Sequence, residues 1–135
     1  MALVYITRRE CFCASHILYS EQFSSERNLE VFGSCATLHG HNYEMEVTIA
    51  GEVQVETGYV VDLKKVKDLI RSEIIQKVDH RHLNTDVDFL KGINPTVENL
   101  AQTFWNILEP KIPSGALYSI RLRETENNVV EYRGG

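Results

Sequence analysis

The chain has 135 residues, of which 43% are hydrophobic and 24% are charged, and its formal net charge is −5. We expect one soluble domain over residues 1–135 in the cytoplasm, because no apolar run approaches membrane length and an odd count of three cysteines favours free thiols. The acidic balance argues against non-specific nucleic-acid binding, which needs a basic surface, but it allows a small anionic substrate.

Alternating apolar residues predict a strand from Leu3 to Ala14. His16 shares the parity of this strand's apolar residues, so its side chain is expected to emerge from their face where the strand ends. The polar segment 19–34 is predicted to be a long connection, and such connections are often functional. A second alternating stretch, from His41 to Val55, predicts a half-buried antiparallel strand.

Two amphipathic helices are predicted in the middle of the chain. The first begins at Asp62, a favourable N-cap, and its apolar residues recur at helical spacing as far as Val78. The second begins at Asn94-Pro95-Thr96 and ends at Pro110. Residues 79–93, between the two helices, are predicted to form a loop.

Two final strands are predicted at Leu117–Arg123 and Val129–Tyr132, which gives the order β-β-α-α-β-β. We therefore expect an α+β fold with an antiparallel four-stranded sheet and two helices on one face. An open sheet has two exposed edges, a liability that pairing between subunits removes. Closure of several subunits into a barrel is thus a hypothesis, and a monomeric mass by light scattering would count strongly against it.

The five histidines all lie in polar clusters, His16, His39-Gly40-His41 and Asp79-His80-Arg81-His82. On an extended segment, residues two apart project from one face, so His39 and His41 can converge on one ion. With His16 at another strand end, three imidazoles could bind Zn²⁺ and leave one position open for water or substrate. The alternative is a set of surface imidazoles at a polar strand start.

Cys35 precedes His39 by four residues and has three interpretations. Its thiol could complete a closed Cys-His₃ structural zinc site, act as a thiolate beside the metal, or be an inert buried group. Cys35→Ala would lose zinc in the first case and keep it in the second. Cys11 and Cys13 form a Cys-x-Cys pair that we expect to pack in the core or at an interface.

Asp79 and His80 together are similar to an orienting carboxylate with an acid–base imidazole. Taken alone, these residues favour a charged, solvated loop, and His82 is expected to be a surface or structural residue. Glu124, at the end of an apolar strand, could hold the guanidine-like edge of a 2-amino-4-oxo heterocycle through two hydrogen bonds. Without further context it is an ordinary strand-end acid.

Seven segments together resemble the 6-pyruvoyl-tetrahydropterin synthase superfamily, which includes 6-carboxytetrahydropterin synthase. They follow the family order over essentially the whole chain, and their combination is far more specific than any one of them. The segments are Phe12-Cys13-Ala14-Ser15-His16, Phe32-Gly33-Ser34-Cys35, Leu38-His39-Gly40-His41-Asn42-Tyr43, Gly58-Tyr59-Val60-Val61-Asp62, Val78-Asp79-His80-Arg81-His82-Leu83-Asn84, Pro95-Thr96-Val97-Glu98-Asn99 and Glu124-Thr125-Glu126-Asn127-Asn128.

The resemblance implies the tunnelling fold, in which trimers close a barrel and two trimers stack into a homohexamer with active sites between subunits. The chain would then be a single pterin-synthase domain, and the three histidines would hold catalytic zinc. Cys35 would be the catalytic thiol, with Asp79 and His80 as the partner acid–base pair. The expected substrate is 7,8-dihydroneopterin triphosphate.

Other features of the resemblance concern the substrate. Glu124 would anchor the pterin ring, with Thr96 and Glu98 near it. No redox cofactor is needed, because the reduced ring supplies the electrons. The family commonly has Arg after the first zinc histidine, whereas this chain has Ile17, so any role of that Arg in holding phosphate or a neighbouring subunit must pass to another cation.

The spacing between Cys35 and His39 bears on the product. Three intervening residues resemble the 6-carboxytetrahydropterin synthases, and the pyruvoyl-type enzymes usually have two more. Residues 28–33 and 124–128 look closer to the pyruvoyl type. We give the short gap more weight, because it sets where the thiol stands relative to zinc.

The predicted function is accordingly a zinc-dependent lyase reaction that yields 6-carboxy-5,6,7,8-tetrahydropterin, acetaldehyde and triphosphate, for queuosine precursor synthesis. The first alternative is 6-pyruvoyl-tetrahydropterin synthesis by triphosphate elimination, in the tetrahydrobiopterin pathway. An alternative of another class is a non-catalytic, zinc-stabilised pterin-binding module.

Overall fold

A five-stranded sheet with the order β3-β1-β2-β4-β5 forms the centre of the computed structural model, which describes residues 2–135. Two long strands dominate it, and they pair antiparallel along their whole length, from Val4 opposite Gly51 to His16 opposite His39. Strand β4 pairs antiparallel with β2 and β5, whereas β3 runs parallel to β1. The strands are β1 (Val4–His16), β2 (His39–Gly51), β3 (Arg81–His82), β4 (Ala116–Thr125) and β5 (Asn128–Tyr132).

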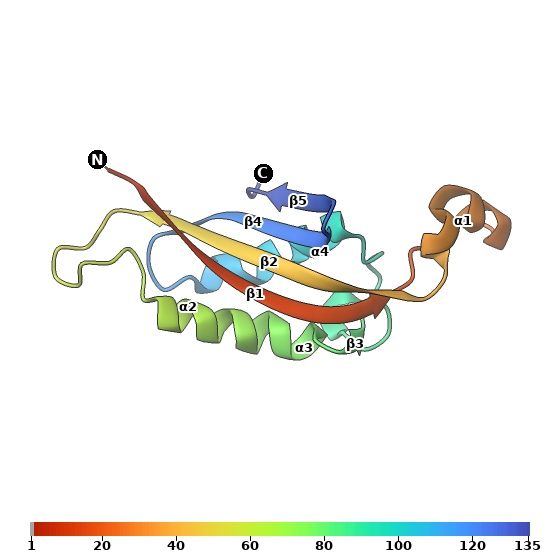
Figure 1. Ribbon diagram of the computed structural model, residues 1–135, viewed down its shortest axis with the longest axis horizontal. Coiled ribbons are helices and arrows are strands. Elements are labelled where there is room, and N and C mark those ends of the chain that lie inside the picture. The colour runs from red at the N-terminus through yellow and green to blue at the C-terminus, as the bar shows by residue number, and fades with distance from the viewer. Residues whose placement is uncertain (1) are drawn as a thin grey trace.

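Helices α2, α3 and α4 lie on one side of this sheet, and α1 projects beyond the end of β1 and β2 (Figure 1). Helices α2 and α3 are joined through a π-helical turn, η2, into one continuous segment. No helix within residues 2–135 has the length and apolar character needed to cross a bilayer. The bounds are α1 (Ser25–Phe32), α2 (Leu63–Ile70), η2 (Arg71–Ile75), α3 (Gln76–Val78) and α4 (Val97–Leu108), with short 3₁₀ turns η1 (Gly33–Ala36), η3 (Asp88–Leu90) and η4 (Glu109–Lys111).

Side-chain hydrogen bonds begin the two long helices where the sequence predicts them. The Asp62 carboxylate accepts from the Lys64 N–H, and the Thr96 hydroxyl accepts from the Asn99 N–H. Each cap satisfies one backbone donor that the first helical turn leaves free.

The predicted sheet was wrong in its strand count and in being purely antiparallel. Residues 81–82, placed in a loop, form the edge strand β3, which is too short to show an alternating pattern. Residues 25–32, placed in a long connection, form α1, a helix with no buried residue and therefore no apolar stripe for periodicity to detect. The other predicted strands and helices are confirmed, with ends shifted by a few residues.

The core lies between the sheet and the helices. Alternate residues of β2, from Tyr43 to Ile49, are almost fully buried, and Phe12, Ala14 and His16 face the same layer from β1. They meet the apolar faces of α2 and α4, which contribute Val66, Ile70, Leu100, Phe104 and Leu108. As predicted, His16 projects from the same face of β1 as Phe12 and Ala14, at the end of the strand.

One carboxylate is buried next to this core. Glu10 of β1 is 8% exposed and accepts hydrogen bonds from Arg8 at 2.7 Å and from Arg71 at 2.9 Å. Burial raises the pKa of Glu10, but the hydrogen bonds from the two guanidinium groups outweigh it, so the pKa lies below its ordinary value of 4.5. The network ties β1 to the start of η2.

We expect Glu10→Gln to lower the free energy of unfolding at pH 7 by about 1–2 kcal/mol, because an amide accepts less strongly from two cations. A lowered folded-state pKa gives stability that is present above pH 4.5 and lost as pH falls through the folded pKa. The difference between wild type and Glu10→Gln should therefore shrink near pH 3, as measured by urea unfolding. Glu44→Gln is the control, because its partner Arg9 is exposed; a pH-independent difference for Glu10→Gln would contradict the argument.

Candidate metal centre and active site

Three histidines converge where β1 ends and β2 begins. His16 lies opposite His39 in the strand register, and His41 lies opposite Ala14. Their side chains each offer one ring nitrogen, and these nitrogens lie within 4.8 Å of one another. The predicted grouping of His16, His39 and His41 is therefore present, and it could hold a metal ion.

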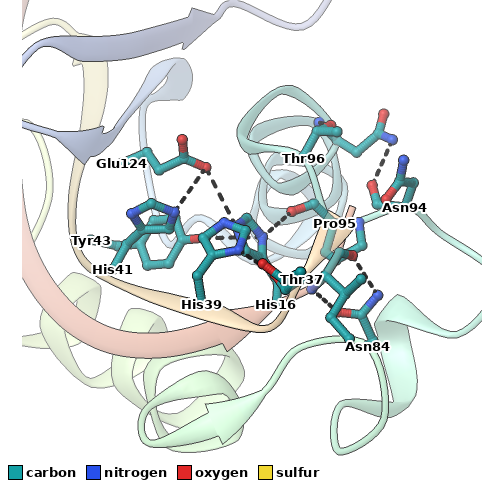
Figure 2. Close-up of polar contacts among 12 residues, drawn as sticks. His16, Thr37, His39, His41, Tyr43, Asn84, Asn94, Pro95, Thr96 and Glu124 are labelled. Atoms are coloured by element: carbon teal, nitrogen blue, oxygen red, sulfur yellow. Dashed lines mark hydrogen bonds and ion pairs between the residues drawn. The ribbon is translucent and has the colours of Figure 1, made fainter. Parts of the chain in front are cut away.

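Backbone carbonyls set the orientation of two of these rings. His16 Nδ1 donates to the carbonyl oxygen of Pro95 at 2.8 Å, and His39 Nδ1 donates to that of Thr37 at 2.7 Å (Figure 2). With the proton on Nδ1, Nε2 carries the free lone pair, which is the arrangement that outer-sphere partners impose on metal-binding histidines. The Nε2 atoms of His16 and His41 are buried and have no hydrogen-bond partner within residues 2–135.

Burial also favours the neutral form of two of these imidazoles, those of His16 and His41. His16 is fully buried, and burial lowers its pKa to about 4. Burial likewise lowers the pKa of His41. Three converging imidazole nitrogens, two of them buried and unpaired, fit a divalent metal ion, because one cation can accept a lone pair from each of them.

Glu124, at the end of β4, points toward this group (Figure 2). Its Oε2 lies 3.8 Å from His16 Nε2 and 3.9 Å from His41 Nε2. The ring of Tyr43 lies beside that of His41, with the two centroids 5.6 Å apart. Its hydroxyl is 3.4 Å from His16 Nδ1, and burial raises the pKa of that hydroxyl. A partly buried carboxylate thus borders the histidine group, where it could hold a polar group of a ligand.

Cys35 lies in η1 and is partly buried. Its thiol is not a member of the group of converging metal-binding atoms found among residues 2–135. This favours a metal site with three protein ligands over the closed Cys-His₃ site. The backbone carbonyl of Cys35 accepts from the Leu18 N–H at 2.8 Å, which ties the segment that carries the thiol to the residues just after His16.

Asp79 and His80 form the predicted pair. Asp79 Oδ2 lies 3.1 Å from His80 Nδ1, while Oδ1 accepts from the Cys13 N–H at 2.9 Å. The Cys13 hydrogen bond and then His80 lower the pKa of Asp79, so it is ionised beside the imidazole. His80 has a φ of 60°, in the left-handed region, at a cost of about 1–2 kcal/mol for a residue with a Cβ.

The pair is nevertheless not next to the histidine group. It joins β1 at Cys13, three residues or about 10 Å along the strand from His16. The side chain of His80 is 80% exposed. In one chain, the predicted acid–base pair thus faces outward from the edge of the sheet.

The other residues that the sequence suggested for the site lie outside the histidine group. Thr96 caps α4, and the carbonyl of the preceding residue, Pro95, accepts from His16, so Thr96 helps to orient His16 through the backbone. Glu98 lies in the first turn of α4. Cys11 and Cys13 are exposed in the single chain rather than packed in its core, which leaves an interface as their predicted environment.

Sequence reasoning missed three residues that organise the site, namely Thr37, Asn84 and Pro95. Two of them act through a carbonyl group, which every residue has, so no sequence signal marks them. Asn84 pairs with the peptide groups of Ile17 and was visible only as part of a motif. His82, expected to be a surface or structural residue, is structural, because its Nδ1 accepts from the Asn84 N–H at 3.2 Å.

A family model, related sequences and solved structures all relate this chain to the same family of proteins. The family model for 6-pyruvoyl tetrahydropterin synthase matches residues 5–135. A 6-pyruvoyl tetrahydrobiopterin synthase of Dictyostelium discoideum is 43% identical over 131 residues, which cover 97% of this chain and 96% of the relative. The structure of Caenorhabditis elegans 6-pyruvoyl tetrahydropterin synthase superposes with a TM-score of 0.93 at 38% identity, covering 100% of this chain and 98% of that one.

A 6-carboxy-5,6,7,8-tetrahydropterin synthase of Rickettsia bellii is more distant. It is 32% identical over 148 residues, which cover 96% of this chain and 99% of the relative. The chain therefore belongs to the 6-pyruvoyl tetrahydropterin synthase family, as its motifs predict.

Replacing any one histidine of the triad with alanine should raise the dissociation constant for Zn²⁺ by more than about 100-fold, since loss of an outer-sphere partner alone costs 10–100-fold. A competing chromophoric chelator measures this directly. His80→Ala is the matched control, because His80 lies outside the converging group, and it should bind as wild type does. Stoichiometric zinc retained by His39→Ala under competition would contradict the assignment.

Proposed function

We propose that this protein is a zinc-dependent 6-pyruvoyl-tetrahydropterin synthase that acts on 7,8-dihydroneopterin triphosphate. The observation that carries the proposal is the convergence of three imidazoles, two of them with unpaired Nε2 atoms, beside a partly buried carboxylate and a tethered thiol segment. Three protein ligands leave a position open, which is the arrangement of catalytic rather than structural zinc.

The comparisons favour this product over the 6-carboxy product that the short gap between Cys35 and His39 suggested. The relative named for biopterin synthesis is 43% identical, whereas the one named for the 6-carboxy product is 32% identical. Only Ala36, Thr37 and Leu38 lie in the gap, and the thiol is still carried by a separate 3₁₀ turn, η1, whose place is fixed by the hydrogen bond from the Leu18 N–H to the Cys35 carbonyl. Its length alone is therefore a weak guide to the product.

Each residue of the site has a chemical task in this proposal. Bound zinc would lower the pKa of hydroxyl groups on the substrate side chain. The Cys35 thiolate and the His80 imidazole would move protons on and off the side-chain carbons, with Asp79 fixing the His80 tautomer. Glu124 would accept hydrogen bonds from the amino and ring N–H groups of the pterin, and triphosphate would leave by elimination.

We also propose that the site is completed by a second copy of the chain. The outer edge of β1 pairs with β3 only at Ala14 and Ser15, so within residues 2–135 the rest of that edge has no strand partner. Such an edge is commonly covered by pairing. Because His80 faces outward from this edge, closure of the barrel would bring it toward the Cys35 of a neighbour, in a hexamer of two stacked trimers.

The product assay tests the reaction. Zinc-loaded protein incubated anaerobically with 7,8-dihydroneopterin triphosphate should release triphosphate and give a 6-pyruvoyl product by mass spectrometry, and Cys35→Ala should keep zinc but lose turnover. A 6-carboxy pterin with acetaldehyde would show that the short gap does set the outcome. Zinc binding without turnover would instead support the binding-module alternative.

Mixing of variants tests the shared site. Cys35→Ala and His80→Ala should each be inactive alone, yet subunits mixed by co-expression should regain about one quarter of wild-type activity, because some sites then combine an intact Cys35 with an intact His80 from different chains. Co-expression of Cys35→Ala with a Cys35→Ala, His80→Ala double variant is the matched control and should stay inactive. If mixed hexamers form but no activity is recovered, both residues of a site come from one chain.

A further inference from the structure

The peptide groups of the residue after His16 are paired with a side chain. Asn84 Oδ1 accepts from the Ile17 N–H at 2.8 Å, and Asn84 Nδ2 donates to the Ile17 carbonyl at 2.9 Å (Figure 2). A side-chain amide has one acceptor and two donors, so it can pair with a peptide unit in both directions as a neighbouring strand would. Asn84 thus extends the edge of the sheet past the end of β1.

The short strand β3 explains why a side chain takes this position. Parallel pairing of β1 and β3 ends at Ser15 and His82, and the Leu83 N–H still donates to the Ser15 carbonyl at 2.8 Å. The backbone then leaves the sheet in a turn, in which Asp86 N–H donates to the His82 carbonyl at 2.9 Å. No β3 backbone remains opposite Ile17, and the Asn84 amide supplies the missing partner.

The next residue connects this pairing to the thiol. The Leu18 N–H donates to the Cys35 carbonyl, so residues 17–18 bridge Asn84 and Cys35. On the other side of Cys35, the Thr37 hydroxyl donates to the Ser34 carbonyl at 2.6 Å, and the Thr37 carbonyl holds His39. Cys35 is therefore tied through its own carbonyl to Leu18, two residues after His16, and the residues that follow it are tied through Thr37 to His39.

These tethers matter because packing contributes little here. Neither α1 nor η1 has a buried residue. A segment with few buried contacts opens locally at low free-energy cost, and its position then depends on a few hydrogen bonds. The Leu18–Cys35 bond is one of these, and its donor is held in place by the Asn84 amide.

We propose that Asn84 is a positioning residue that fixes the Cys35 thiol relative to the histidine triad. Asn84 acts through Ile17 and Leu18 and does not itself contact the substrate. This inference rests on the proposed function only in assuming that Cys35 acts on the substrate. The position of the thiol can be measured without turnover.

The test uses a Cys11→Ser, Cys13→Ser background, in which Cys35 is the sole thiol of the chain. Asn84→Ala in this background should raise the rate of Cys35 alkylation by iodoacetamide by about tenfold, the size expected when a local opening loses hydrogen-bond support. In the zinc-loaded enzyme, kcat should fall by about 10–100-fold because misplacement by 1 Å is costly, while KM and zinc content stay near their background values.

Two further variants separate positioning from general damage. Asn94→Ala removes a single, longer bond to the same connection, from the Tyr19 N–H at 3.3 Å, and should change alkylation and kcat by less than about twofold. Asn84→Asp keeps the acceptor for the Ile17 N–H but sets a carboxylate oxygen against the Ile17 carbonyl in place of the donor, so its effects should be at least as large as those of Asn84→Ala. It also serves as the test if Asn84→Ala does not fold.

The outcomes are distinct. An unchanged rate of Cys35 alkylation in both Asn84 variants overturns the proposal. The proposal is also overturned if the Asn84 variants lose zinc, stability and activity together and Asn94→Ala loses them as well. Faster alkylation with zinc retained and kcat unchanged supports the positioning role but removes Cys35 from the chemistry. That result would contradict the proposed function and not the role of Asn84.

Discussion

The antiparallel ladder between β1 and β2 is the constraint on which the site depends. It runs for thirteen residues on each strand and brings His16 opposite His39 at its end. Because side chains alternate along a strand, a slip of one residue would turn one strand's histidines to the other face. The register is secured by the buried alternate residues of β2, Tyr43 to Ile49, so burial of apolar surface in the core also determines the geometry of the metal centre.

The loops next to this ladder contribute backbone carbonyl groups that accept hydrogen bonds from the histidines. The carbonyl groups of Pro95 and Thr37 hold His16 and His39 with their Nε2 lone pairs turned inward. The carbonyl of Pro95 is in place because Thr96 starts α4 there, and α4 is packed on the sheet. Helix capping, core packing and imidazole tautomer are therefore linked, and the three histidines are preorganised by the same contacts that stabilise the fold.

The groups proposed to move protons lie on less buried parts of the chain. Cys35 is carried by η1, which has no buried residue, and His80 is exposed in a left-handed backbone conformation at the sheet edge. The three histidines and the groups proposed to move protons are thus on different elements. This division suits a site that a neighbouring subunit completes, since the exposed groups are available to an incoming surface.

The sequence alone determined the order of the long elements and the three zinc-ligand candidates, because alternation, helical spacing and clustered histidines are local patterns. The motifs likewise indicated the family that the comparisons confirm. Only the tertiary structure decided that β3 pairs with β1 and that the carbonyl groups of Thr37 and Pro95 orient two imidazoles. It also decided that the Asn84 side chain forms hydrogen bonds with the peptide groups of Ile17. These contacts join residues far apart in the chain or use backbone groups common to every residue, so no local pattern encodes them.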